Sequence, residues 1–314
     1  MGLAYAHGHV RGGNPRARTM LECFATVIQD YYNPPPNTKD MRHHLDQMVL
    51  KPSFTYWTTV CRPHSVSMGN AFTFLKTTVA ALPRDGMTLQ DMKDTLVETI
   101  HEYIREHITY ADQAIANFGS EKIVTGDVLL TYGNPSVLPV LLQTALDQGK
   151  TFRLIVVDSR PLLEGKHLVQ QLLLMYPDLD ITYIFLHALS YVMPQVTKVI
   201  LGASALLSEG SVLSRVGTAG IALSAHQAGI PVLVCAETYK MSHRTQLESI
   251  TQNELGNPQD IIKGEDGKLS SWRVMNLLYD LTPSHMVSVI VTELGMLPPT
   301  SVAVLLREMN PGSM

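Results

Sequence analysis

The sequence has little cysteine, and the few cysteines are scattered. Cys23, Cys61 and Cys235 are three residues spread along a chain of 314. They form neither a disulfide framework nor the paired spacing of a zinc site. Reduced thiols in a protein of the cytosol are the ordinary interpretation, and we expect that location. His43 and His44 stand in a polar stretch without further ligands, so we expect no metal site.

Long apolar runs and an excess of basic residues are also absent. The longest apolar runs, such as residues 231–236, are too short to cross a bilayer, and the N-terminus lacks the pattern of a signal peptide. The formal charge is −4, whereas nucleic-acid binding leaves a clustered basic footprint. No Walker-type loop occurs, so the chain is not expected to hold GTP. We therefore expect no membrane, nucleic acid or cofactor among its ligands.

The first part of the chain has a helical pattern. Hydrophobic residues make up 45% of the sequence and charged residues 17%, a balance typical of a folded protein and not of a disordered one. Apolar residues recur at helical spacing, which predicts helices over residues 17–31, 65–82 and 88–118. The prolines at 34–36 end the first helix because proline lacks the amide donor. Thr88 is the expected N-cap of the third.

From about residue 120 short apolar runs alternate with helical stretches. The runs have strand length and are expected over residues 127–132, 152–158, 181–186, 198–202 and 231–236. The helical stretches are expected over residues 135–148, 161–176, 188–194 and 212–228. Strand–helix–strand at this spacing predicts parallel strands with right-handed crossovers. We therefore predict an α/β protein with an N-terminal helical domain, residues 1–119. A C-terminal domain, residues 120–314, would carry a doubly wound, mostly parallel Rossmann-like sheet.

Two later segments leave alternatives open. Residues 239–271 are polar and contain turn chemistry at 257–258 and 264–268. A loop of that length is either functional or a tolerated surface insertion. The mostly apolar run 286–294 fits either one more strand or a buried helix. In a sheet of this class ligands bind beyond the carboxyl ends of the strands, so those ends are where a site is expected.

Several short segments, taken in order, carry a resemblance to a known family. They are residues 8–14, 61–71, 130–133, 157–161, 202–204, 217–220, 235–240, 279–283 and 293–298. Their order and spacing resemble the alpha, beta and delta regulatory subunits of translation initiation factor 2B. That family is homologous to ribose-1,5-bisphosphate and methylthioribose-1-phosphate isomerases. The resemblance covers nearly the whole chain, and residues 11–14, 253–255 and 293–296 look most like the delta branch.

The resemblance also locates the catalytic positions of the isomerases. Those enzymes use a cysteine and an aspartate for proton transfer between carbons of an open-chain sugar phosphate. Gly133 matches the cysteine position and Ser204 the aspartate position. Glycine has no side-chain proton to exchange, and a serine without a neighbouring base is a poor substitute at neutral pH. We therefore predict an isomerase-like chain without catalytic activity.

The phosphate-binding groups of the isomerases are matched in part. The candidates for a residual anion pocket are Arg11, Gly12, Arg62, Arg215, Gly217 and Thr218. The last two stand at or near an expected helix start, where free amides and the helix dipole favour an anion. One hypothesis is therefore a residual pocket for a sugar phosphate or nucleotide. The other is that the arginines pair with carboxylates such as Asp158 and hold the two regions together.

For function, the resemblance implies a regulatory subunit of the guanine nucleotide exchange factor for translation initiation factor 2. It implies dimerisation with a beta subunit through the C-terminal α/β region, and assembly with alpha, gamma and epsilon subunits. It further implies that the chain senses phosphorylation of the alpha subunit of factor 2. The alternatives are a sugar-phosphate isomerase and a metabolite-sensing module that uses the residual pocket.

The resemblance suggests where these partners bind. The candidates for a surface that meets the phosphorylated factor are Arg42, Lys51, Arg62 and Arg84 in the helical region. The alternative for each of them, a solvated surface residue, is the more ordinary interpretation. The candidates for the subunit interface are Met286, Val289, Leu294 and Met296, and plain core packing is the alternative for any one of them.

Overall fold

The computed structural model describes residues 1–32, 40–83, 86–262 and 274–309. The chain divides into two compact units, Met1–Ala111 and Asp112–Met314. The sequence pattern placed its boundary at residue 119, which lies inside helix α7 (Ala111–Glu121). A helix runs through the division, so the helical periodicity does not mark it.

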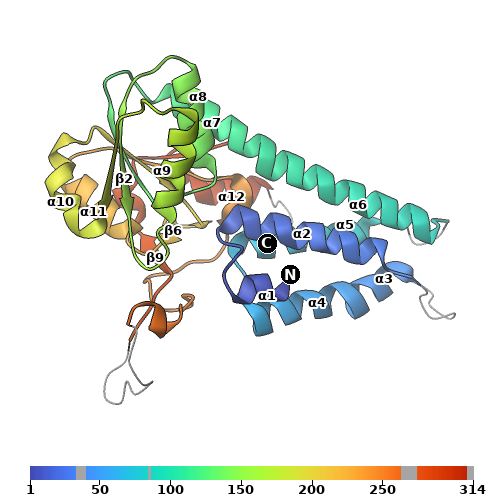
Figure 1. The fold of residues 1–314 in the computed structure, drawn as a ribbon. Coiled ribbons are helices and arrows are strands. Elements are labelled where there is room, and N and C mark those ends of the chain that lie inside the picture. The colour runs from blue at the N-terminus through green and yellow to red at the C-terminus, as the bar shows by residue number, and fades with distance from the viewer. Residues whose placement is uncertain (33–39, 84–85, 263–273, 310–314) are drawn as a thin grey trace. The chain divides into compact units, whose positions relative to one another are not determined.

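The N-terminal unit is built of helices (Figure 1). They are α1 (Gly2–Ala6), α2 (Gly13–Gln29), α3 (Met41–Leu45), α4 (Lys51–Tyr56), α5 (Val66–Ala81) and α6 (Leu89–Ile104), with π-helical turns at Asp46–Leu50, Trp57–Cys61 and Arg105–Tyr110. The predicted N-cap is confirmed, since the Thr88 side chain accepts a hydrogen bond from the Asp91 amide. Ser65 caps α5 in the same way through the Met68 amide.

Three long helices of this unit, α2, α5 and α6, share one core. Their buried faces carry large apolar side chains such as Met20, Phe24, Phe72 and Leu96. The Phe24 and Phe72 rings stack with centroids 5.5 Å apart, a geometry that adds to the energy of burial. The predicted first, second and third helices are thereby confirmed. The short helices between residues 41 and 61 were not predicted.

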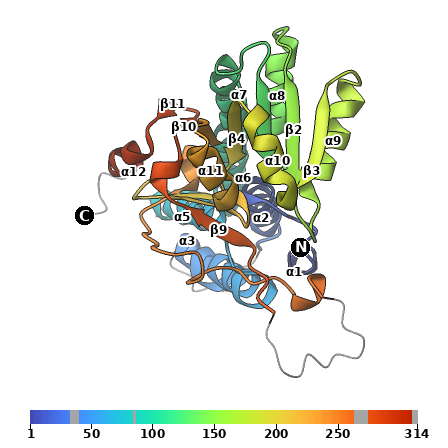
Figure 2. The ribbon, with the colours of Figure 1, turned by 90° about the vertical axis from the view of Figure 1, so that its left-hand side faces the viewer.

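The C-terminal unit is built on a mostly parallel sheet (Figures 1 and 2). Its strands are β1 (Val128–Tyr132), β2 (Arg153–Asp158), β3 (Ile181–Phe185), β4 (Lys198–Gly202), β7 (Val232–Cys235), β10 (Val289–Thr292) and β11 (Gly295–Leu297). They lie in the order β11-β10-β7-β4-β1-β2-β3. Of the strand pairs described in this sheet, β10 with β11 is antiparallel and the rest are parallel. The predicted fold class is confirmed, and the run 286–294 supplies a strand and not a buried helix.

Helices cover both faces of this sheet. Helix α7, with α8 (Val137–Asp147) and α9 (Glu164–Met175), packs on the face that carries Leu129, Leu154 and Ile200. The opposite face carries Leu130, Ile155 and Val199 under α10 (Leu189–Val192), α11 (Thr218–Gln227) and α12 (Val302–Met309). Alternate residues of one strand therefore enter different cores, which explains why the strands are continuously apolar.

A second, smaller sheet corrects one prediction. Its strands are β8 (Met241–Ser242), β5 (Ala205–Leu207), β6 (Val212–Arg215) and β9 (Tyr279–Thr282), in the order β8-β5-β6-β9. The sequence predicted a helix over residues 212–228, which is wrong for its first part. Residues 212–215 form β6, paired with β9, and the helix begins at Thr218. One partner of β6, β5, directly precedes it in the chain, but the other, β9, lies far along the chain, so local periodicity could not reveal that pairing.

The polar segment after residue 239 is only partly irregular. It contains β8, a 3-10 turn at Pro258–Asp260 and a bridge between Leu255 and Leu277. The predicted turn at residues 264–268 lies outside the described residues. The segment leads into β9, and residues 276–278 at its end form one wall of a pocket.

Candidate functional site

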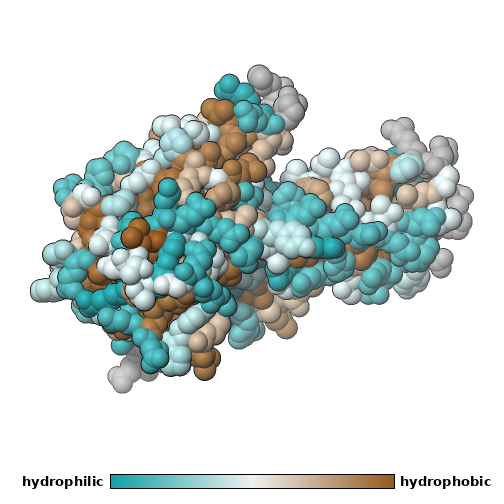
Figure 3. All heavy atoms as spheres, turned by 90° about the horizontal axis from the view of Figure 1, so that it is seen from above, coloured by the Kyte–Doolittle hydropathy of each residue, from teal (hydrophilic) through white to brown (hydrophobic). Residues whose placement is uncertain are grey.

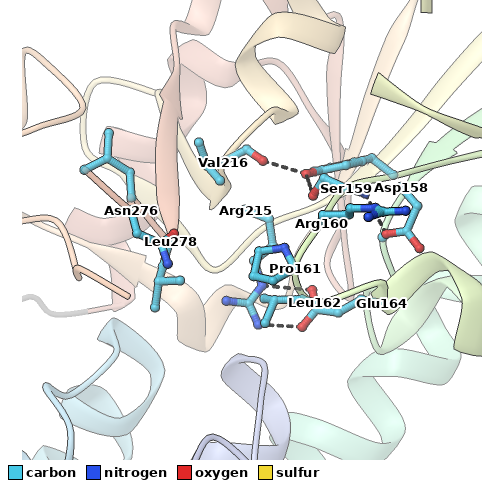
Figure 4. Close-up of a pocket in the computed structure, with 13 residues that line it drawn as sticks. Asp158, Ser159, Arg160, Pro161, Leu162, Glu164, Arg215, Val216, Asn276 and Leu278 are labelled. Atoms are coloured by element: carbon cyan, nitrogen blue, oxygen red, sulfur yellow. Dashed lines mark hydrogen bonds and ion pairs between the residues drawn. The ribbon is translucent and has the colours of Figure 1, made fainter. Parts of the chain in front are cut away.

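A small pocket lies at the carboxyl end of the main sheet (Figure 4). Its walls come from the ends of β1, β2 and β6 and from the segment before β9. The lining residues are Tyr132, Gly133, Asp158, Ser159, Arg160, Pro161, Leu162, Glu164, Arg215, Val216, Asn276, Leu277 and Leu278. The strand order reverses direction at β1, and ligands of doubly wound sheets bind at such a point. The cavity volume is about 50 Å³, far below the roughly 300–1,000 Å³ of a typical ligand pocket.

Arg215 is held by a carboxylate of the same pocket. Its Nε donates to Oε2 of Glu164 at 3.0 Å, and its Nη2 donates to Oε1 at 2.6 Å. Both side chains are about four-fifths buried, and the two parallel bonds are visible in Figure 4. This is the bidentate geometry in which an arginine pairs most strongly with a carboxylate. The same fork would otherwise be available to a phosphate.

Asp158 is not the partner of Arg215, which corrects the pairing suggested by the sequence. Its Oδ1 accepts from the Ser159 amide, and its Oδ2 accepts from the Lys166 amide and the Tyr183 hydroxyl. These bonds fix the turn after β2 and the start of α9. The signal that would have pointed to Glu164 is its place in the first turn of a helix that follows a sheet strand.

The N-terminus of α11 already holds an anion, the side chain of Asp280. Gly217, with φ of +107°, and Ala219 donate their amides to Oδ2 of Asp280 at 2.7 and 3.0 Å. The Thr218 hydroxyl donates to the Arg215 carbonyl at 2.6 Å. The group at this helix start is therefore a carboxylate of the chain itself, and a residual pocket for an external anion stays a prediction.

The surroundings of Asp280 act on the pKa of its carboxyl group in opposite directions. Burial raises the pKa of its carboxyl to about 6, while the amides of Ala219 and Gly217 act in the opposite direction. Its second oxygen, Oδ1, has no hydrogen-bond partner within the described part of the chain. Sequence reasoning missed this residue, because β9 was not predicted.

Tyr132 completes the polar contacts of the pocket. Its hydroxyl donates to the Val216 carbonyl at 2.6 Å and bonds the Ser159 hydroxyl at 2.7 Å. Burial raises the pKa of Tyr132 to about 12, so the phenol stays neutral near pH 7. It links β1, the turn after β2 and the end of β6.

The two positions that the resemblance matched to the catalytic residues of the isomerases are a glycine and a serine. Gly133 follows β1 with φ of +65°, a left-handed conformation that L side chains rarely adopt. A Cβ there would lie 3.9 Å from Oε2 of Glu164. Ser204 follows β4, is half-buried, and donates its amide to the Leu213 carbonyl at 2.8 Å. The absence of isomerase activity remains a prediction.

The other anion-pocket candidates belong to the N-terminal unit. Gly12 precedes α2 with φ of +87°. Arg11 donates its Nε to the Gly8 carbonyl at 2.6 Å, and Arg62 donates Nη1 to the Val10 carbonyl at 3.4 Å. Both arginines thus contact backbone in their own unit. Their part in a pocket with Arg215, Gly217 and Thr218 stays a prediction.

The candidates for the factor-binding surface differ in their surroundings. Arg42 pairs with Asp40 at 2.9 Å and donates to the Ala80 and Leu82 carbonyls at the end of α5. Lys51 pairs with Asp46 at 3.0 Å and is about two-fifths exposed. Arg84 lies outside the described residues. Arg42 therefore has a clear structural role, while Lys51 is accessible.

The candidates for the subunit interface differ in how far their side chains are buried. Met286, Val289 and Met296 are partly buried and pack against the two cores of the C-terminal unit. Leu294, in the turn between β10 and β11, is 61% exposed. An exposed leucine is free to meet a partner, so Leu294 is the member of this set that an interface would use.

Metal and membrane sites were sought over the same residues. Within residues 1–32, 40–83, 86–262 and 274–309, no three His, Cys, Asp or Glu side chains come together as metal ligands would. The helices in those ranges include none that combines the length and apolarity needed to span a bilayer.

Comparison with known proteins places these features in a family. A model described as the initiation factor 2 subunit family matches residues 9–299. A Dictyostelium discoideum protein named translation initiation factor eIF2B subunit delta is 41% identical over 98% of this chain and 50% of its own length. The ribose 1,5-bisphosphate isomerase of Pyrococcus furiosus is 30% identical over 95% of this chain and 90% of its own.

A solved structure is similar over most of the chain. In the tetrameric eIF2B-beta2-delta2 complex from C. thermophilum, one chain matches with a TM-score of 0.83 and 30% identity. The match covers 93% of this chain and 89% of that one. The chain spans half the length of the Dictyostelium relative.

Proposed function

Because the chain belongs to the initiation factor 2 subunit family, we propose that it is a regulatory subunit of the guanine nucleotide exchange factor for translation initiation factor 2. The observation that carries the proposal is the similarity to the delta relative over 98% of this chain. The likeness to a chain of a beta–delta complex supports it. Fold alone would not support a function, since one fold serves many.

In this proposal the subunit is not an enzyme. The isomerase relative gives the competing function, but the groups that would do its chemistry are absent at Gly133 and Ser204. The pocket that would hold a sugar bisphosphate has a volume of about 50 Å³ and contains the Arg215–Glu164 pair. A glycine and a serine do not supply the cysteine and the aspartate that the isomerase resemblance requires, so we expect no isomerase turnover. In this proposal the function depends on the surface of the subunit and not on the pocket.

The partner we propose for the C-terminal unit is the beta subunit. Two related α/β chains would form a pseudo-twofold dimer, and alpha, gamma and epsilon subunits would join it. Exposed apolar side chains mark such surfaces when they gather in patches. The face drawn in Figure 3 carries apolar patches among polar ones, and Leu294 is one exposed apolar residue of the unit.

The helical unit is our candidate for contact with the alpha subunit of factor 2. Phosphorylation adds about two negative charges, and a sensor must contact the two forms differently. Lys51 offers an accessible positive charge there, and within the described residues it pairs with Asp46 at 3.0 Å. Exposure of the lysine side of this pair limits its strength, so the lysine can exchange its partner.

Mass-resolved size exclusion of the chain, alone and mixed with a beta subunit, tests the proposal. We expect the mixture to give a defined 1:1 dimer or a dimer of dimers. A clean homodimer that ignores the beta subunit would contradict it. In that case a ligand of the C-terminal pocket would become the next hypothesis.

A further inference from the structure

Two places in the C-terminal unit have the chemistry to hold a phosphate. The first is the guanidinium fork of Arg215, whose planar donors match the oxygens of a phosphate or a carboxylate. The second is the start of α11, where amides and the helix dipole favour negative charge. Arg215 lines the pocket, and the start of α11 lies just beyond the lining, since Val216 lines the pocket and Gly217 follows it in the chain.

Each of these places is already filled by a carboxylate of the chain. Glu164 receives both donors of the Arg215 fork at 3.0 and 2.6 Å. Asp280 receives the amides of Gly217 and Ala219 at 2.7 and 3.0 Å. A phosphate at either place would have to break two charge-assisted hydrogen bonds first.

The charges around the pocket also oppose an incoming anion. The charged side chains of the lining are Asp158, Glu164, Arg160 and Arg215, and these cancel. Asp280 lies just behind, bonded to the residue after Val216, and brings the local sum to one negative charge. A phosphate dianion would therefore meet net negative charge, and screening is weaker beside the largely buried Arg215 and Glu164 than in bulk water.

The same cluster still has capacity for more hydrogen bonds. Over the described residues, Nη1 of Arg215 and Oδ1 of Asp280 are buried and have no hydrogen-bond partner. A buried donor or acceptor that makes no hydrogen bond costs free energy of folding, because it has lost its contact with water. An oxygen anion in the place of the Glu164 carboxylate could use the freed fork and the remaining Nη1 donor, and one in the place of the Asp280 carboxylate could use both amides.

We propose that this site is self-liganded: the carboxylates of Glu164 and Asp280 occupy the positions that phosphate oxygens would take and close the pocket to phosphate. Removal of both carboxylates would then uncover a working anion site. The inference does not rest on the proposed assembly function, because it concerns occupancy of a pocket and not a partner.

The test compares phosphate binding by the whole chain before and after removal of the carboxylates. The variants are Glu164→Ala with Asp280→Ala, and the probe is inorganic phosphate titrated by calorimetry against chloride of equal ionic strength. We expect no saturable binding by the wild type and at least about tenfold tighter binding by the double variant. Recovery of one charge-assisted contact corresponds to roughly ten- to a hundredfold in affinity.

A matched control tests whether any cation released from an ion pair would bind phosphate equally well. Asp127→Ala releases Lys198, its partner at 2.5 Å, at the opposite end of β4. Phosphate should bind this variant no better than the wild type. Arg215→Gln added to the double variant should abolish the gain.

Two results would overturn the proposal. One is saturable phosphate binding by the wild type that matches the double variant, since the site would then be open. The other is a double variant that binds phosphate no better than the Asp127→Ala control. If the double variant does not fold, Glu164→Gln keeps the side-chain volume and should show a smaller gain; no gain there counts equally against the proposal.

Discussion

At the scale of the residue, Asp280 is a carboxyl group whose burial costs free energy of folding when it is ionised. Its carboxylate is about nine-tenths buried, and burial disfavours the charged form. Two amides at the start of α11 recover part of that cost. The pKa of about 6 records the balance, so the group changes charge within the range in which cells work.

The raised pKa predicts a pH dependence that Asp280→Asn should remove. Because the folded pKa lies above the unfolded value of 3.8, the folded state binds the proton more tightly. The stabilisation is complete below about pH 4 and is lost as the pH rises through about 6. Two pKa units correspond to at most about 3 kcal/mol. Urea unfolding from acid to neutral pH should show this slope in the wild type and not in the variant.

Asp127 provides a control of opposite sign. Burial raises the pKa of its carboxyl, but bonds from Lys198, the Val124 amide and Thr197 outweigh burial and hold it below the usual range. Its contribution is therefore present at neutral pH and lost as the pH falls. Asp127→Asn should destabilise the chain at neutral pH. Identical pH profiles for the wild type and Asp280→Asn would refute the assignment.

At the scale of elements, β4 and the turn before α8 approach each other closely. A Cβ on Gly202, the last residue of β4, would lie 2.3 Å from Cβ of Pro135, just before α8. Proline is rigid, so the clash cannot be relieved by a rotamer change. The glycine lets β4 pass directly beside the turn that follows β1.

We expect Gly202→Ala to destabilise the C-terminal unit by about 1–3 kcal/mol, the usual cost of an overpacked site. Gly220→Ala is the matched control, since its added Cβ in α11 would meet nothing within 4 Å. Alanine is the better helix former there and should add about 0.5–1 kcal/mol of stability. Thermal unfolding of both variants checks the pair. Equal midpoints would show that β4 and Pro135 do not approach as closely as described.

At the scale of the whole molecule, the division into two units suggests that each unit binds a different partner. Each has its own core, and the described residues of neither core belong to the other unit. We propose that the C-terminal unit binds the beta subunit and the helical unit the alpha subunit of factor 2. A variant confined to the surface of one unit should then spare the function of the other.

Leu294→Glu tests that division. Leu294 is 61% exposed, so a charge there should leave the thermal midpoint within the small range usual for surface substitutions. In an interface the same charge would be buried without a partner and should weaken beta binding by about 2 kcal/mol or more. Co-purification with the beta subunit measures the effect.

Leu174→Glu on α9 is the control, because Leu174 is 85% exposed and lies outside the proposed interface. It should co-purify with the beta subunit as the wild type does. If Leu294→Glu also co-purifies unchanged, the turn between β10 and β11 is not part of the interface.

Local patterns in the sequence predicted the long helices of the first unit, the strands β1 to β4 and the α/β class, because helical periodicity, strand length and chain breaks depend on neighbouring residues. They also placed Gly133 and Ser204 just after β1 and β4, whereas α11 begins at Thr218 and not at residue 212 as predicted. Only the tertiary structure decided which carboxylates meet Arg215 and Gly217. Glu164 and Asp280 reach them through strand pairing and crossovers between distant segments, and no local pattern encodes which buried charge will find which partner.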